Sequence, residues 1–182
     1  MKRRDFIKFA GAAGAASLAG CATPGGAKGR VVVVGGGYGG ATAAKYLRMW
    51  EPGIDVVMVE RNDVFTSCPM SNLVLGGNRT IEEIRRTYDG LRRRGVRVVN
   101  DEATAIDAAK KVVRLQRGGE LQYDRLIVSP GIDFNFNEIE GYQAAQNRIL
   151  HAWKAGPQTV ALRGQLEAMK DGGVYVLAVP LA

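Results

Sequence analysis

The chain has 182 residues, of which 46% are apolar, so it is long enough for one modest domain and short for a two-domain enzyme. Its formal charge is +7, but four basic residues and one acidic residue lie within residues 1–20, and the rest of the chain carries only +4. The densest basic stretch, residues 85–97, is expected to form a solvated face, and no nucleic-acid partner is predicted. Cys68 is the only cysteine after residue 21, which excludes a disulfide-rich scaffold.

The N-terminal residues 1–29 are predicted to lie outside the folded domain. KRRDFIK at residues 2–8 precedes the uncharged residues 9–20, a pattern typical of a twin-arginine signal peptide that directs a protein to the periplasm. The sequence LAGC at residues 18–21 resembles a bacterial lipobox, which makes Cys21 a candidate lipid anchor to a membrane. The alternative is a small-residue cleavage site followed by an unmodified cysteine. Residues 21–29 are interpreted as a tether.

The folded part is predicted to begin with a strand–helix–strand unit. Residues 31–34 are four valines, as expected for a strand buried on both faces of a parallel sheet. A helix is predicted over residues 39–50, and a second buried strand over residues 56–59 ends at Glu60. This order is typical of an α/β domain with a Rossmann-like parallel sheet flanked by helices.

Three further segments are predicted after this unit. A helix is expected over residues 80–95, because Thr80 and Glu83 form a capping box and apolar residues recur three and four positions apart. A third strand follows at residues 96–99, and residues 102–128 predict an antiparallel β-meander inserted before the chain returns to the main sheet. Pro157 is expected to open a last helix, and residues 174–180 to form another buried strand.

The glycine-rich turn after the first strand predicts a dinucleotide site. Gly35, Gly37 and Gly40 occur as G-x-G-x-x-G, where the first glycine permits a tight turn, the second admits a pyrophosphate and the third permits close packing of helix and strand. The amides of the helix N-terminus, including those of Tyr38 and Gly39, favour bound phosphate. Glu60 stands where a carboxylate would accept hydrogen bonds from the ribose.

The meander favours FAD over NAD, because such an insertion is the layout of flavin domains in the two-dinucleotide disulfide-reductase class. YDRLIVSPG, residues 123–131, resembles the second flavin motif of that class, with Ser129, Pro130 and Gly131 in place of its usual Ala-Thr-Gly. Arg61, beside Glu60, and Ala103, at the start of the meander, complete the predicted cofactor contacts.

Five segments resemble the flavoprotein subunits of flavocytochrome c sulfide dehydrogenases, and the similarity runs from Arg30 to the last residue. The resemblance implies an exported enzyme that oxidises sulfide to sulfur or polysulfide and passes electrons through FAD to a c-type cytochrome subunit. It also implies a covalent bond from Cys68 to the 8α-methyl of the flavin; the alternative is a structural cysteine or half of a disulfide. The segments are RVVVVGGGYGGATAAKYL, FTSCPMSNLVLGG, YDGLRRRGVRVV, YDRLIVSPGID and HAWKAGPQTVALR.

The same resemblance places the redox-active cystine beyond residue 182. We therefore expect residues 30–150 to be the first part of an FAD-binding domain and residues 151–182 to begin a second, truncated dinucleotide domain, with no catalytic residue, no metal site and no turnover in this chain alone. Direct use of NAD is disfavoured because no glycine turn follows residue 177, and His151 is expected to pack or cap. Two alternatives stay open: an enzyme like sulfide:quinone oxidoreductase, and a module without activity that binds FAD or nothing.

Overall fold

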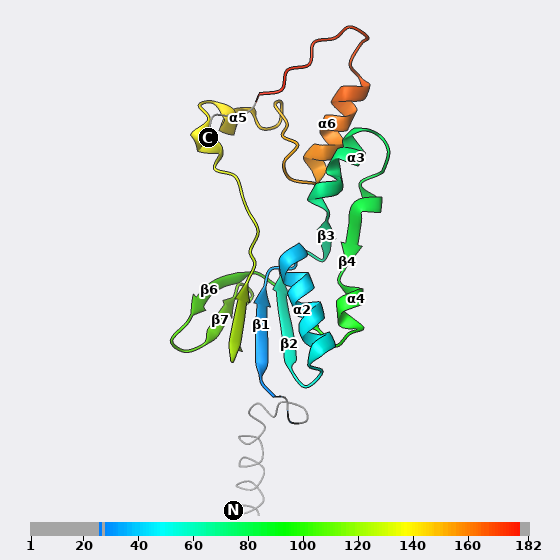
Figure 1. Cartoon of the computed structure of the whole chain (residues 1–182). Coiled ribbons are helices and arrows are strands. Elements are labelled where there is room, and N and C mark those ends of the chain that lie inside the picture. The colour runs from blue at the N-terminus through cyan, green and yellow to red at the C-terminus, as the bar shows by residue number, and fades with distance from the viewer. Residues whose placement is uncertain (1–25, 27, 179–182) are drawn as a thin grey trace, which may run out of the picture.

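The computed structural model (Figure 1) describes residue 26 and residues 28–178. The predicted signal peptide, residues 1–20, and the candidate lipid attachment site at Cys21 lie outside the described residues. None of the described helices is both long and apolar enough to cross a bilayer.

A parallel sheet of four strands forms the centre of the structure, in the order β5-β2-β1-β9. The valines of β1 and β2 lie opposite one another, with Val32 beside Val57, and both are fully buried. This confirms the Rossmann-like fold and the strands predicted from the valine runs. The strands are β1 (Arg30–Val34), β2 (Asp55–Glu60), β5 (Arg97–Asn100) and β9 (Arg125–Val128).

Each face of the sheet has its own apolar core. On one face, α2 (Tyr38–Trp50) and α4 (Asp89–Arg92) bury Ala44 and Leu91 against the sheet residues Val33 and Met58. On the other face lies the predicted antiparallel meander, formed by β6 (Ala103–Asp107), β7 (Val112–Leu115) and β8 (Glu120–Gln122). Alternate valines of β1 and β2 point to the two cores, and each buried valine contributes about 1.5–3 kcal/mol of burial free energy.

The helix predicted over residues 80–95 is wrong. A 3₁₀ turn η2 (Glu82–Ile84) and a strand β4 (Arg85–Thr87) precede α4, and β4 pairs antiparallel with β3 (Val64–Thr66). The capping contacts exist, since the Thr80 amide donates to Glu83 Oε2 at 2.7 Å, but they close only the 3₁₀ turn. Ile84 ends η2 and Tyr88 directly precedes α4, so the pairing of β4 with β3 interrupts the predicted helix between these two residues.

The β3–β4 ribbon leads from the sheet to a second pair of helices (Figure 1). Beyond β3 lie a 3₁₀ turn η1 (Cys68–Met70) and α3 (Ser71–Leu75), which packs on α6 (Pro157–Glu167); Arg163 Nη1 donates to the Leu75 carbonyl at 2.9 Å. Helix α6 begins at the predicted proline, and the Gly156 amide donates to Thr159 Oγ1 at 3.1 Å. A 3₁₀ turn η3 (Phe136–Glu138) and α5 (Tyr142–Ala145) lie between β9 and α6.

The strand predicted over residues 174–180 is also wrong for its described part, residues 174–178. These residues have no strand assignment, and Val174 and Val176 are 86% and 79% exposed. Residues 179 and 180 lie outside the described residues. A parallel strand that is buried on both faces needs paired neighbours and covering layers, and no described strand pairs with this segment.

Candidate cofactor site

Two of the three motif glycines are required by the fold itself. Gly35 has a φ of +98°, and a Cβ there would overlap the carbonyl oxygen of Ser129. A Cβ at Gly40 would overlap the carbonyl oxygen of Gly35. The turn from β1 into α2 is therefore closed too tightly for any side chain at either position, as the sequence predicted.

Gly37 differs, because nothing in the described protein requires a glycine there. It has an ordinary φ of −68°, and the nearest atom to an added Cβ would be Phe65 Cε2 at 4.0 Å. The first backbone bond of α2 runs from the Ala41 amide to the Gly37 carbonyl, and no side chain caps this helix end. The amides of the first turn are thus available for an anion, and the space beside Gly37 allows one to approach.

Glu60 holds the glycine turn against the end of β2. Its Oε2 accepts a hydrogen bond from the Gly36 amide at 2.7 Å, and its Oε1 accepts bonds from the Asn62 amide and side chain at 2.9 and 2.8 Å. Each carboxylate oxygen carries two lone-pair sites, so capacity remains for the hydroxyls of a ligand. Glu60 therefore positions the glycine turn, and its contact with a ribose stays a prediction.

The other predicted contacts divide between the two sides of this turn. On the Glu60 side, Arg61 forms a 3.8 Å ion pair with Glu102, which directly precedes Ala103 at the start of β6. On the other side, the Ser129 amide donates to the Val34 carbonyl at 2.8 Å, which brings Ser129 and the following Pro130 against Gly35. Gly131 adopts a φ of +82° and is exposed, with no protein atom within 4 Å of an added Cβ.

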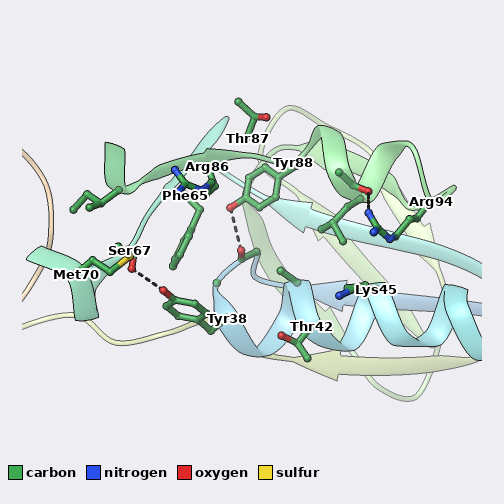
Figure 2. Close-up of a pocket in the computed structure, with 16 residues that line it drawn as sticks. Tyr38, Thr42, Lys45, Phe65, Ser67, Met70, Arg86, Thr87, Tyr88 and Arg94 are labelled. Atoms are coloured by element: carbon green, nitrogen blue, oxygen red, sulfur yellow. Dashed lines mark hydrogen bonds between the residues drawn. The ribbon is translucent and has the colours of Figure 1, made fainter. Parts of the chain in front are cut away.

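Cys68 lies directly after a residue that is bonded to the start of α2. Ser67 Oγ and Tyr38 Oη are 2.6 Å apart, and the Tyr38 ring meets Phe65 edge to face (Figure 2). The exposed Cys68 thiol donates to the Trp153 carbonyl at 2.8 Å. The contacts of Ser67 and Phe65 with Tyr38 thus place the predicted attachment residue, Cys68, near the start of α2. The sequence did not single out Ser67 or Phe65.

Tyr88 is a third residue near the glycine turn that the sequence did not single out. It was assigned to the apolar side of a helix, whereas its buried side chain donates through Oη to the Gly36 carbonyl at 3.1 Å (Figure 2). Burial, and then the Glu60 carboxylate, raise the pKa of Tyr88 far above its usual value, so it stays a donor. Gly36 is therefore held at both its amide and its carbonyl.

Replacing Tyr88 by phenylalanine is expected to lower the free energy of unfolding by about 1 kcal/mol, because one buried hydrogen bond is lost and the Gly36 carbonyl is left unpaired. The affinity for FAD should fall as well, since the turn loses one of its two supports. Urea denaturation and FAD titration measure the two effects. Tyr46→Phe, on the exposed face of α2, is the control and should change neither. Equal stabilities of the wild type and Tyr88→Phe would contradict this role.

His151 packs as expected, between aromatic rings. Its ring centroid lies 4.9 Å from that of Phe134 and 6.0 Å from that of Phe136, and its buried Nδ1 has no hydrogen-bond partner among the described residues. Burial, and then the charge of Lys154, lower the pKa of His151.

Because this pKa is lower in the folded state, His151 contributes stability above its unfolded pKa of about 6.5 and loses that contribution as the pH falls through the lower folded value. Urea denaturation should therefore show lower stability at pH 5.0 than at pH 7.5, and His151→Leu should remove most of that difference. Lys154→Met should reduce it only in part, since burial is the larger cause. A pH dependence that persists in His151→Leu would contradict the assignment.

Comparison with known proteins agrees with the resemblance found in the sequence. Over 45 residues, the chain is 60% identical to the sulfide dehydrogenase [flavocytochrome c] flavoprotein chain of Chlorobaculum thiosulfatiphilum. The aligned segment covers 25% of this chain and 94% of that sequence. It is 25% identical over 156 residues to the mitochondrial sulfide:quinone oxidoreductase of Dictyostelium discoideum, covering 83% of this chain and 34% of that protein.

Comparison with solved structures also finds a sulfide:quinone oxidoreductase. The X-ray structure of sulfide:quinone oxidoreductase from Aquifex aeolicus matches with a TM-score of 0.67 and 25% sequence identity, over 76% of this chain and 31% of that chain. The chain thus spans about a third of the length of the two sulfide:quinone oxidoreductases. Residues 29–160 match the family model described as "Pyridine nucleotide-disulphide oxidoreductase". With this match over most of its length, the chain belongs to the pyridine nucleotide-disulphide oxidoreductase family.

Proposed function

We propose that the chain is the FAD-binding N-terminal part of a sulfide dehydrogenase flavoprotein subunit, which oxidises sulfide to sulfur or polysulfide. The observation that carries the cofactor assignment is Gly37, a glycine that the protein does not need for its own conformation, at an uncapped helix N-terminus. The sulfide assignment is supported by the 60% identity to a sulfide dehydrogenase flavoprotein chain.

In this proposal the cofactor extends along the carboxyl ends of the strands, on both sides of the glycine turn. Gly35 and Gly40 shape the turn, and the backbone at Gly37, Tyr38 and Gly39 contacts the pyrophosphate. Toward the adenosine, the contacts are Glu60, Arg61 and Ala103. Toward the flavin, they are Ser129, Pro130, Gly131 and Cys68. Bound FAD would supply the two-electron acceptor for sulfide and would return the electrons one at a time.

Cys68 is proposed to bond covalently to the flavin. Cys68 is eight positions after Glu60, and an extended chain of that length spans about 26 Å, comparable with the length of an extended FAD. Cys68 would supply Sγ, after loss of the thiol proton, to the 8α-methyl carbon in place of one hydrogen, and bound flavin would accept the two electrons released and pass them to the cytochrome. The thiolate is the nucleophilic form of cysteine. The Ser67–Tyr38 hydrogen bond supports this role, because it holds the preceding residue beside α2.

Export and partners are proposed from the sequence. The twin-arginine pattern supports transport to the periplasm, and Cys21 is the proposed lipid attachment site that would hold the protein at a membrane. A c-type cytochrome is the proposed partner subunit, since the similar protein of Chlorobaculum thiosulfatiphilum is named as a flavoprotein chain of flavocytochrome c.

Retention of flavin by the purified chain tests the proposed cofactor. The chain is produced with excess FAD, desalted and measured for visible flavin absorbance against protein concentration. We expect about one flavin per chain, because the turn supplies several amides and a helix N-terminus to the pyrophosphate. A colourless protein under these conditions would overturn the proposal.

The second candidate function is electron transfer to a membrane quinone. It is favoured by the match to sulfide:quinone oxidoreductases over 83% and 76% of this chain. The FAD-loaded chain, reduced anaerobically with a stoichiometric amount of dithionite, is mixed with oxidised cytochrome c or with decylubiquinone. Our proposal predicts faster reoxidation by cytochrome c, and faster reoxidation by the quinone would favour the second candidate.

A further inference from the structure

A second space lies beside the glycine turn but leads away from the residues proposed for FAD. It is a cavity of about 440 Å³ that begins at Gly36 and Gly37 and continues between α2 and the β4–α4 segment, as far as Lys45 and Arg94 (Figure 2). Lys45 is seven positions after Tyr38 in α2, which corresponds to about 10 Å along the helix axis. None of Glu60, Cys68 and Ser129 lines this cavity. Gly37 and Tyr38, whose backbone is proposed to contact the pyrophosphate, do line it. The cavity therefore adjoins the proposed cofactor site and extends away from it along α2.

The charged side chains of this cavity are all cations. Lys45, Arg86 and Arg94 line it, together with no aspartate or glutamate. Within the part of the chain that the structure describes, none of the three forms an ion pair. Arg94 Nη1 donates to the Gly90 carbonyl at 2.9 Å, and Arg86 Nη1 donates to backbone carbonyls. Lys45 Nζ lies 5.1 Å from the centroid of the Tyr46 ring. None of the three charges is therefore balanced by a carboxylate among the described residues.

Ion pairing differs among the neighbouring arginines. Arg93, which does not line the cavity, forms no ion pair among the described residues, whereas two others do. Arg92, on α4, lies 3.1 Å from Asp89, and Arg97, at the start of β5, lies 3.3 Å from Asp55. Neither arginine lines the cavity. Lys45 on α2 and Arg94 beyond α4 lie toward one end of the cavity, and Arg86 lies beside Phe65 toward the other (Figure 2). Cations without counter-ions raise the local potential and favour an anion there.

The walls between these cations are apolar and partly aromatic. Phe65, Ile84 and Leu91 line the cavity, and Ile84 and Leu91 are buried. A small inorganic anion would leave such walls uncovered, whereas a flat apolar body would cover them. We propose that the cavity between α2 and α4 binds an aromatic carboxylate, with its carboxylate between Lys45 and Arg94 and its ring against Phe65 and Leu91. Arg is suited to a carboxylate because its guanidinium presents two parallel donors.

A matched pair of ligands tests this proposal on the purified full chain, loaded with FAD. 2-Naphthoate carries the charge and 2-naphthamide is its neutral isostere, so calorimetric titration of both separates charge recognition from apolar burial. We expect 2-naphthoate to bind at least tenfold more tightly than 2-naphthamide. The affinity for 2-naphthoate should change less than twofold when FAD is in further excess. Absence of binding, equal affinities, or displacement by FAD would each overturn the proposal.

Three variants then locate the site. The double variant Lys45→Met/Arg94→Met should weaken 2-naphthoate at least tenfold and leave 2-naphthamide unchanged. Arg93→Met is the matched control, because Arg93 follows α4 directly, carries the same charge and does not line the cavity. It should change the affinity less than twofold, and an equal loss in this variant would overturn the proposal.

Thr42→Trp, at an exposed lining residue, fills the cavity, so it should abolish binding of both ligands. Continued binding would likewise overturn it.

Discussion

Replacing Gly37 by alanine is expected to leave the fold intact and to lower FAD affinity at least 100-fold, equivalent to about 2.7 kcal/mol. The protein has room for the new methyl group, since its nearest neighbour would be Phe65 Cε2 at 4.0 Å, and the φ of −68° suits any residue. The free energy of unfolding should therefore change by less than about 1 kcal/mol. The methyl group would instead occupy the approach of the pyrophosphate to the amides of α2.

Gly40→Ala is the matched control for this prediction. The same added methyl group would there overlap the Gly35 carbonyl oxygen, so we expect a loss of about 3 kcal/mol or more of stability, or an insoluble protein. Urea denaturation gives the stabilities, and FAD titration in a Cys68→Ser background gives the affinity without covalent trapping. If Gly37→Ala bound FAD as the parent protein does, the pyrophosphate assignment would fail. Unfolding of Gly37→Ala would instead show that the glycine serves the fold.

Replacing Cys68 by serine is expected to abolish covalent retention of the flavin while the protein stays folded. The side chain is exposed and forms no disulfide, and a serine hydroxyl can donate to the Trp153 carbonyl in place of the thiol, so the change in unfolding free energy should stay within about 0.5 kcal/mol. After denaturation in urea, the wild-type chain should keep its FAD, and Cys68→Ser should release all of it. Mass spectrometry of the denatured proteins, and flavin fluorescence of the protein band, measure the difference.

Ser67→Ala separates the attachment chemistry from the local structure. It removes the 2.6 Å contact with Tyr38 and leaves the thiol in place, so covalent attachment should become slower and still reach completion. Wild-type protein that releases its flavin freely on denaturation would remove the thioether from the proposal, while one retained flavin per native chain would still support noncovalent binding of FAD.

The sequence alone predicted the centre of this fold, because its signals are local. Four consecutive valines, a glycine turn and a second valine-rich run specify a strand, a turn and a strand whatever the rest of the chain does. The meander was predicted from short strand-like pieces separated by turn residues, and the proline at residue 157 marked the start of α6. The positive φ of Gly35 and the contact of Gly40 with the Gly35 carbonyl are local, so the sequence assigned both glycines to the fold correctly, whereas the close approach of Ser129 to Gly35 comes from a distant segment.

The errors arose where a local pattern has two solutions. The spacing of Ile84, Tyr88 and Leu91 fits a helix, yet the strand β4 between Ile84 and Tyr88 pairs with β3, and both residues are buried on either side of it. The apolar residues 174–177 predict a buried strand only if neighbouring strands pair with them, and no described strand does so.

The glycine turn follows from residue types at short separations, and the sequence therefore determined it by itself, while anion binding there stays a prediction. Only the tertiary structure decided that Glu60 and Tyr88 hold Gly36 from both sides, that Ser67 joins Tyr38 ahead of Cys68, and that three cations line one cavity. These contacts join residues 24 to 52 positions apart in the chain. Their formation depends on which elements pack together, and that choice is made by burial of apolar surface across the whole domain rather than by any short segment.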